Sequence, residues 1–250
     1  MGKIALKMLF GDRAKYLGLI FGVTFATLLM SQQISIFVGI MARTAGTINS
    51  ITEADIWVMD KRVRYVDEVE PMRDIELSNV RSVEGVLWAV PFYKSLITIR
   101  MPDGLTQQVQ LLGIDDVSLV GICPKKILGD PLSIRAPDTA MMDLNGYYFT
   151  WPNQPLTLGK YVELNDHRLI INAICKVQPT FLTFPILYVS YNTALAITPP
   201  QRNKLSFILV KTKEGYTKEQ VIKNIEEKTQ LQALTQRDFA WRSINYYLTR

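Results

Sequence analysis

The longest apolar run of the chain covers residues 16–42 (YLGLIFGVTFATLLMSQQISIFVGIMA) and contains no charged side chain. A helix of this length extends about 40 Å, whereas the hydrocarbon core of a bilayer is about 30 Å thick. The polar residues Ser31, Gln32, Gln33 and Ser35 gather in its second half, near the point where a span of about 20 residues reaches the far interface. The pattern predicts one membrane-spanning helix.

A shorter apolar pattern precedes the span. Residues 3–14 (KIALKMLFGDRA) place apolar side chains beside two lysines, which is typical of an amphipathic helix on a membrane surface. An unstructured basic tail is the alternative for these residues. We therefore divide the chain into a cytoplasmic amphipathic or basic N-terminus at residues 1–15, a transmembrane helix at residues 16–42 and an extracytoplasmic domain at residues 43–250.

Charge is distributed unevenly along the chain. The formal net charge is +5, and most of it lies in residues 1–43, where Asp12 is the only acidic residue. The remainder is nearly neutral, which argues against the basic stripe of a nucleic-acid-binding protein. Cations before the span, with Glu53 and Asp55 after it, follow the positive-inside rule. The predicted orientation has the N-terminus in the cytoplasm and residues 43–250 outside.

A cleaved signal peptide is the alternative interpretation of the same segment. Its basic start fits, and residues 42–45 (ARTA) offer small side chains for cleavage. However, the apolar core of a signal peptide runs about 7–15 residues, and the run at residues 16–42 is roughly twice as long. A retained span is the favoured interpretation.

After the span the pattern changes to short alternating segments. Strands are predicted at residues 54–60, 95–101, 106–113, 160–164, 168–177, 187–190 and 205–211, and helices at residues 74–84 and 217–229. Pro102-Asp103-Gly104 and Asn165-Asp166 are turn sequences that close two hairpins. Residues 121–159 are the least regular section, and their five prolines interrupt any long element. The predicted fold class is a mixed α+β domain, arranged as two lobes that divide near residues 115–180.

Two local signals mark helix ends. Thr217 and Gln220 have the spacing of a capping box at the start of the second helix. Gly85 follows the first helix, where a glycine commonly ends the helical conformation.

The two cysteines, Cys123 and Cys175, lie in the part predicted to be outside, where a disulfide can persist. Cys175 follows Leu169, Ile171 and Ala173 on the apolar face of a strand, and a small buried thiol is the simpler interpretation there. The spacing does not establish that the two sulfur atoms meet, so both states remain open.

The end of the chain (FAWRSINYYLTR) mixes aromatic and basic side chains. Trp241, Tyr246 and Tyr247 lie close to Arg242 and Arg250. Such a mixture is typical of a membrane interface. A terminal helix that packs its aromatic rings on the domain explains it equally well.

Candidate chemistry is sparse, and no residue is assigned a catalytic, cofactor-binding or metal-binding role. Phosphate-loop, nucleophile-elbow and zinc-protease motifs are absent from the sequence. His167 is the only histidine, and its place at a turn favours an exposed loop residue. Asp115 and Asp116 are adjacent, so their side chains point apart. Residues 147–151 (YYFTW) favour a plug of the irregular region over a contact surface. Gln32 and Gln33 fit either a substrate path or the end of the span.

Four segments together resemble the MacB/FtsX superfamily of ABC-transporter permeases, including its DevC-like members. They are the opening ALKMLFGDRAKYLGLIFGVTFATLLM, then ADIWVMD, NVRSVEGVLWAVPFY and QLLGIDDVSLVG, in the order of the family's first membrane helix and extracytoplasmic domain. The family's V-x-G-V and G-[IV]-D motifs fall here at residues 83–86 and 113–115. The resemblance spans essentially the whole chain. Three further membrane helices follow the domain in such permeases, and Arg250 lies about where the second membrane helix would begin.

The resemblance implies a non-enzymatic permease subunit of the bacterial inner membrane without a cofactor. A cytoplasmic ABC ATPase would bind near residues 3–15, a second permease copy would pair with the first, and a periplasmic adaptor would meet the outer domain. ATP-driven motion would then reach that domain for export across the cell envelope. The alternative is a signal-anchored extracytoplasmic domain that binds a ligand as a sensor. An anchored hydrolase is disfavoured because His167 has no credible partners.

Overall fold

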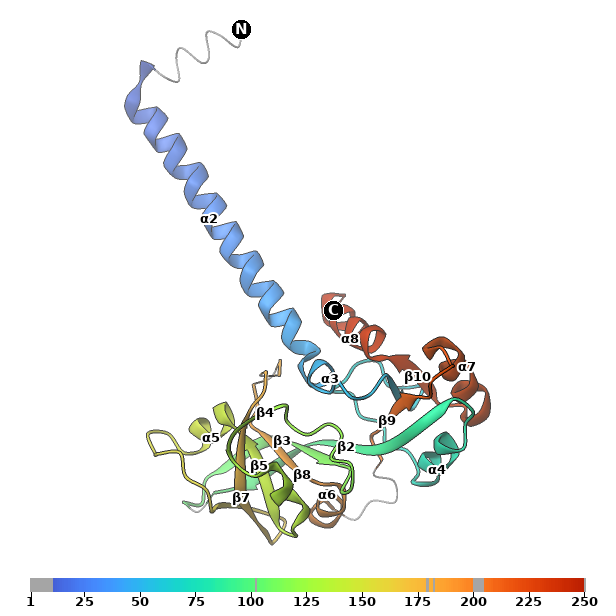
Figure 1. The fold of residues 1–250 in the computed structure, drawn as a ribbon. Helices are drawn as coiled ribbons and strands as arrows, with labels where there is room; N and C mark the ends of the chain where they lie inside the picture. Colours follow the sequence, from blue (N-terminus) through green and yellow to red (C-terminus); the bar gives the residue numbers. More distant parts are fainter. Residues whose placement is uncertain (1–10, 102, 179, 182, 200–204, 250) are drawn as a thin grey trace. The chain divides into compact units, whose positions relative to one another are not determined.

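The computed structural model describes residues 11–249 except Pro102, Pro179, Leu182 and residues 200–204. The chain divides into two compact units, Met1–Ala42 and Arg43–Arg250. The helices are α2 (Arg13–Thr44), α3 (Gly46–Ser50), α4 (Ile75–Arg81), α5 (Leu144–Thr150), α6 (Tyr191–Ile197), α7 (Lys218–Thr229) and α8 (Gln236–Leu248), with a 3-10 helix η1 (Pro131–Arg135). The strands are β1 (Ile56–Met59), β2 (Val86–Arg100), β3 (Thr106–Ile114), β4 (Lys125–Gly129), β5 (Thr139–Asp143), β6 (Lys160–Leu164), β7 (His167–Lys176), β8 (Ile186–Ser190), β9 (Phe207–Thr212) and β10 (Gln232–Thr235) (Figure 1).

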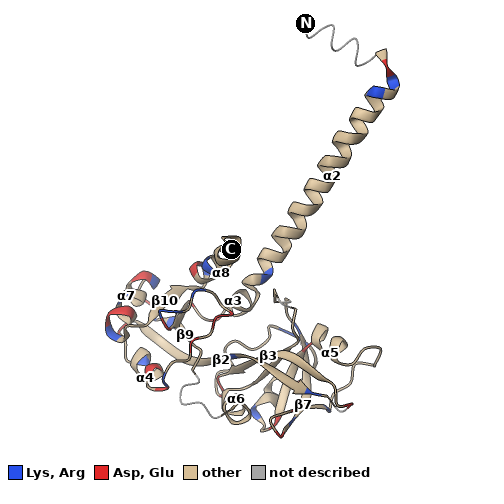
Figure 2. Ribbon diagram, turned by 180° about the vertical axis from the view of Figure 1, so that it is seen from behind, with Lys and Arg blue, Asp and Glu red and all other residues tan. Residues whose placement is uncertain are grey.

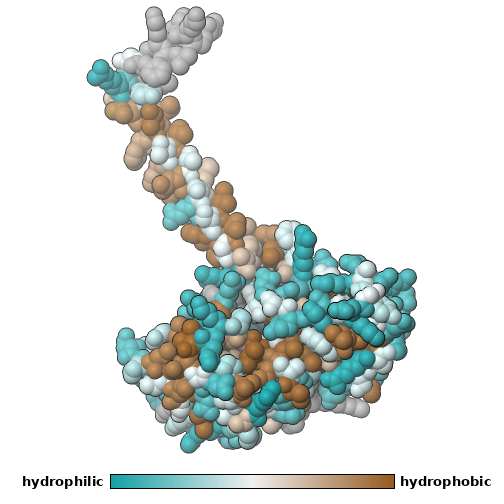
Figure 3. Space-filling model, viewed as in Figure 1, coloured by the Kyte–Doolittle hydropathy of each residue, from teal (hydrophilic) through white to brown (hydrophobic). Residues whose placement is uncertain are grey.

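Helix α2 contains the whole apolar run. Its charged residues lie only at its two ends (Figure 2), and apolar side chains cover much of its surface (Figure 3). The helix predicted at residues 16–42 therefore exists and extends slightly at both ends. By length and composition it can cross a membrane. The amphipathic helix expected at residues 3–14 falls mostly outside the described residues.

The strands of the second unit join in one sheet with the order β10-β1-β9-β2-β3-β8-β5-β7-β4, and β6 pairs with both β2 and β7. This last pairing closes β2, β3, β8, β5, β7 and β6 into a ring, because Arg100 of β2 is paired with Glu163 of β6. We call this ring with α5 and α6 the barrel lobe. Strand β4 also belongs to the barrel lobe, because it pairs with β7. Strands β1, β9 and β10, the first half of β2 and helices α3, α4, α7 and α8 form the layered lobe. The α+β fold class predicted from the sequence is confirmed.

The layered lobe has helices on both faces of its sheet. On one face Ile56 and Val58 of β1 pack with residues of α4 and α7. On the other face Trp57 lies 5.6 Å from Phe239 of α8 between ring centroids, in the core that also contains Met59. All four residues of β1 are consequently buried, which explains a strand sequence that is apolar throughout.

The barrel lobe is filled by side chains from every strand of its ring. The buried set includes Ile99, Leu111, Met142, Val162, Ile171 and Leu187. Strands β3 and β8 are parallel, and strands β5 and β7 are also parallel. The other pairs around the ring are antiparallel. Strand β2 continues from the layered lobe into the ring, so the two lobes share one long strand.

Several local predictions hold. The hairpins β2–β3 and β6–β7 form with Asn165 and Asp166 at the second turn. Thr217 and Gln220 make both hydrogen bonds of the capping box. Helix α4 ends at Arg81, earlier than predicted, and Gly85 instead adopts φ +88° in the turn into β2. There an added Cβ would lie 2.8 Å from Val221 Cγ2, so this close approach needs glycine.

Residues 121–159 have no long element, as expected, but they contain short elements that the sequence did not predict. The segment contains β4, η1, β5 and α5, and β5 is buried along its whole length. Its strands pair with β7 and β8, which are distant in sequence, so local pattern carries little signal for them. Helices α3 and α6 and strand β10 were also not predicted. Helix α8 is the terminal helix that the sequence left as one of two alternatives, and its Tyr246 stacks on Tyr65 with ring centroids 4.1 Å apart.

A disulfide joins Cys123 and Cys175, whose Cα atoms are 6.3 Å apart. Cys123 precedes β4, and Cys175 lies in β7 with its side chain buried. The fold thus decides between the two states that the sequence left open, because β4, which begins two residues after Cys123, pairs with the end of β7 that contains Cys175.

Candidate functional site: a pocket beside strand β8

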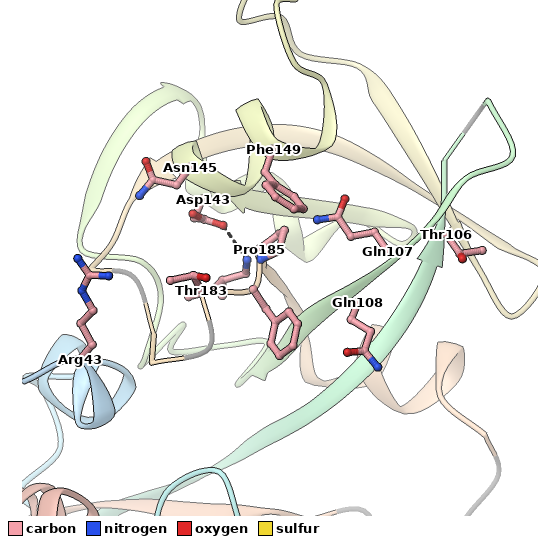
Figure 4. A pocket seen from close by; sticks show the side chains of 11 residues that line it. Arg43, Thr106, Gln107, Gln108, Asp143, Asn145, Phe149, Thr183 and Pro185 are labelled. Carbon is pink, nitrogen blue, oxygen red and sulfur yellow. Dashed lines mark hydrogen bonds between the residues drawn. The ribbon is translucent and has the colours of Figure 1, made fainter. Parts of the chain in front are cut away.

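The outer surface of the barrel lobe carries a pocket of about 650 Å³, which we call the β8 pocket (Figure 4). It is lined by the start of β3 (Thr106, Gln107 and Gln108), by β5 and α5 (Asp143, Asn145 and Phe149), by residues 183–186 before and at the start of β8, and by Arg43. All of these residues belong to the unit Arg43–Arg250.

Asp143 forms the floor of the pocket and has a structural role. Its Oδ2 accepts a hydrogen bond of 2.9 Å from the Gly146 backbone N–H, which caps α5. Its Oδ1 accepts one of 2.6 Å from the Ile186 N–H at the start of β8. Burial raises the pKa of Asp143, although these backbone donors oppose the rise. Both carboxylate oxygens therefore accept hydrogen bonds from the backbone.

Gly146 lets α5 sit close to the segment before β8. An added Cβ would lie 2.3 Å from Asp143 Oδ1 and 2.7 Å from Pro185 Cβ. Distances this short require the neighbours to move, so a larger residue at position 146 would push α5 away from Asp143 and from the segment before β8.

The remaining polar groups of the pocket are amides, hydroxyls and one cation. Gln107 Nε2 is buried and has no hydrogen-bond partner among the described residues. Arg43 has no ion pair in the described part of the chain. The side chain of Phe149 is 70% exposed, and Figure 4 shows it pointing into the same hollow as Gln107. A donor-rich wall next to an aromatic wall suits the binding of a small ligand.

A second polar feature lies where the two lobes meet. Lys94 Nζ, on β2, forms an ion pair with Asp67 and donates a 3.0 Å hydrogen bond to Val66 O. Burial lowers the pKa of Lys94, and the Asp67 carboxylate opposes that shift. Tyr247 of α8 donates a long hydrogen bond of 3.4 Å to the other oxygen of Asp67. The pair lines a cavity of about 210 Å³.

The residues singled out in the sequence do not meet in one site. His167 is exposed at the first position of β7. Asp115 accepts hydrogen bonds from Ser118, whereas Asp116 accepts one from the Asn192 N–H. Among the described residues no group of three or more His, Cys, Asp or Glu side chains is placed to hold a metal.

The aromatic run at residues 147–151 divides between the two roles considered for it. Tyr147 and Trp151 are buried in the barrel core, which is the plug that was expected. Tyr148 and Phe149 are exposed, and Phe149 lines the β8 pocket. Sequence reasoning missed Gln107, Arg43 and Lys94. The isolated lysine in the apolar strand sequence VLWAVPFYKSLITI was the one signal that could have identified Lys94.

No family model and no curated protein matches the sequence. Among solved structures, the periplasmic region of MacB from Actinobacillus actinomycetemcomitans matches 78% of this chain and 94% of its own chain, with 14% identity and a TM-score of 0.55. The fold is that of the MacB periplasmic region. The extracellular domain of the noncanonic ABC-type transporter YknZ from Gram-positive bacteria matches 72% of this chain and 98% of its own, with 13% identity and a TM-score of 0.48.

The MacB-like fold confirms the resemblance seen in the sequence at the level of the extracytoplasmic domain. The segments that carried the resemblance include β1 and parts of β2 and β3. Glycine at 113, in the G-[IV]-D motif, has a packing role in this MacB-like domain. A Cβ there would lie 2.6 Å from Ala194 Cβ of α6.

Proposed function

We propose that the chain is part of the permease subunit of an ABC-type transporter, a non-enzymatic subunit that couples a separate cytoplasmic ATPase to an extracytoplasmic domain during export. One combined observation carries this proposal. A helix long and apolar enough to cross a membrane precedes a domain with the fold of the MacB periplasmic region.

In this proposal α2 crosses the bacterial inner membrane with its N-terminus in the cytoplasm, and residues 43–250 lie outside. The cations before α2 and the acidic residues after it support this orientation. Two copies of the chain pair in the membrane, and a periplasmic adaptor binds the outer domain.

The chain enters the domain through buried residues, which supports a mechanical role. Thr44, at the end of α2, and Ala45 and Ile48 after it are each at most 2% exposed. Gln236 of α8 donates hydrogen bonds of 3.0 and 2.9 Å to the carbonyls of Ile48 and Ile51. A displacement of this entry segment would therefore reach α8 and the layered lobe directly.

Cysteine labelling tests the orientation, since the two native cysteines are joined to each other. Lys223→Cys and Lys15→Cys are matched positions with side chains 75% and 82% exposed. In intact bacteria without an outer-membrane barrier, an impermeant maleimide should label Lys223→Cys at once. It should label Lys15→Cys only after lysis. Equal labelling of both positions in intact cells would contradict a membrane between them.

Photo-crosslinking tests the coupling to an ATPase. A photo-reactive amino acid at position 10 (Phe10), before α2, should crosslink to an ATP-binding subunit in native membranes. The same probe at Lys223 should not. Crosslinks from position 10 to extracytoplasmic proteins alone would refute this assignment.

A further inference from the structure

The β8 pocket presents hydrogen-bond donors and one cation without an ion pair among the described residues. Its one acidic residue, Asp143, has both oxygens occupied by the backbone N–H groups of Gly146 and Ile186. Arg43 keeps its charge without an ion pair among the described residues, and it is exposed. Charge complementarity therefore favours a ligand with an anionic group.

One hydrogen-bond donor of the pocket has no acceptor among the described residues. Gln107 Nε2 is buried and has no hydrogen-bond partner within the described residues. A buried donor without an acceptor is unfavourable, and a ligand oxygen placed beside it would remove that penalty. The exposed amide of Asn145 also lines the pocket and can donate to a ligand there.

The wall next to Gln107 is apolar and open to solvent (Figure 4). Phe149 is 70% exposed, and Phe184 and Pro185 continue its surface. Figure 3 shows apolar side chains gathered over the part of the barrel lobe that carries α5. Covering this wall with an apolar group is favourable in proportion to the area removed from water.

We propose that the β8 pocket binds an amphiphile whose carboxylate or phosphate head lies near Arg43 and whose apolar body extends across the pocket and covers Phe149 (Figure 4). The pocket volume of about 650 Å³ is within the usual range for small-molecule sites. Binding requires only this pocket, so the inference is independent of coupling to an ATPase and of the orientation of α2.

The cavity beside Lys94 is a weaker candidate for the same role. Its volume is about 210 Å³, below the usual range for ligand sites. Its cation is already paired with Asp67, so no charge is left to select an anion.

Calorimetric titration of the full chain in phosphatidylcholine nanodiscs tests the proposal, with empty nanodiscs as the reference. The probe is 6-phenylhexanoate, and its neutral match is 6-phenylhexanamide. The carboxylate should bind at least about tenfold more tightly than the amide, because hydrogen bonds to a charged group are the stronger kind. Equal binding of the two, or no binding of the carboxylate, would overturn the proposal.

Binding of 6-phenylhexanoate to variants of the pocket residues, each with a matched control variant, tests whether the ligand lies in this pocket. Arg43→Gln should weaken binding about tenfold, whereas Arg237→Gln should not change it. Phe149→Ser should weaken binding about fivefold, whereas Tyr148→Ser, at the neighbouring exposed position, should not. An equal loss for a variant and its control would overturn the assignment to this pocket.

Two further probes distinguish the sources of the amphiphile. Tighter binding of decanoate than of 6-phenylhexanoate would support the proposal with a lipid-derived ligand. The reverse order would support it with a small aromatic acid. Inorganic phosphate that binds as tightly as both carboxylates would overturn it, because the apolar wall would then contribute nothing.

Discussion

The layered lobe and the barrel lobe use their strands differently. β1 of the layered lobe is buried at all four positions because helices cover both faces of the sheet. In β7 of the barrel lobe, buried Leu169 and Ile171 alternate with Ile170, which is 38% exposed. The layered lobe therefore uses both strand faces for its core. In the barrel lobe this alternation is confined to part of the ring, since β5 and β8 beside the β8 pocket are buried at every position.

The largest expected effect comes from the aromatic core of the layered lobe. Trp57→Ala removes a ring that lies 5.4 Å from the centroid of Phe207 and 5.6 Å from that of Phe92. We expect the free energy of unfolding to fall by about 3–5 kcal/mol in urea titrations followed by near-UV circular dichroism. Trp241→Ala, at a residue 63% exposed, is the control and should change it by less than about 0.5 kcal/mol. A similar loss in both variants would contradict the assigned core.

The disulfide should have the next largest effect, and it tests the barrel lobe. Replacing Cys123 and Cys175 together by alanine opens a loop of 52 residues. We expect a loss of about 2–4 kcal/mol in the free energy of unfolding. Because β2 runs through both lobes, the urea transition should stay single. Two separate transitions would show that the lobes unfold independently.

Removing either partner of the Lys94–Asp67 ion pair should lower the free energy of unfolding, but by different amounts. Asp67→Asn leaves Lys94, 5% exposed, without a counter-charge, and should cost about 2–3 kcal/mol. Lys94→Met removes the buried charge and leaves Asp67, which is 22% exposed and still accepts from Tyr247. Its cost should be smaller in the same urea titration. A larger loss for Lys94→Met would refute this account of the pair.

The smallest effects come from two aspartates, one in each lobe. Their contributions to the free energy of unfolding should depend on pH in opposite directions. Burial alone would raise the pKa of Asp55, but hydrogen bonds from Lys218, Thr212 and Lys211 outweigh it and lower that pKa. The stabilisation from Asp55 is thus present above its unfolded pKa of 3.8 and is lost as pH falls through the lower folded value. Asp55→Asn should cost about 1 kcal/mol at pH 7, and this cost should shrink on acidification.

Asp143 should behave in the opposite way, because its folded pKa is raised by burial. Its contribution is fully present below the unfolded pKa of 3.8 and decreases as pH rises through the folded value. The cost of Asp143→Asn should therefore grow as pH is lowered from 7 toward 4. Urea titrations of both variants across this range provide the comparison. Parallel pH profiles would contradict the environments described for these carboxyl groups.

The sequence by itself determined the features that depend on neighbours along the chain. The uncharged run predicted α2, alternation and turn residues predicted the hairpins β2–β3 and β6–β7, and Thr217 predicted the start of α7. These signals work because helix hydrogen bonds, caps and tight turns join residues only a few positions apart.

Only the tertiary structure decided the rest. β5 is a strand because β7 and β8 pair with it, and Cys123 reaches Cys175 because β4 lies beside β7. The β8 pocket likewise joins Arg43, Gln107 and Phe149, which are far apart in the sequence. Such contacts depend on burial and pairing between distant segments, and the pattern within one short segment contains no information about its distant partner.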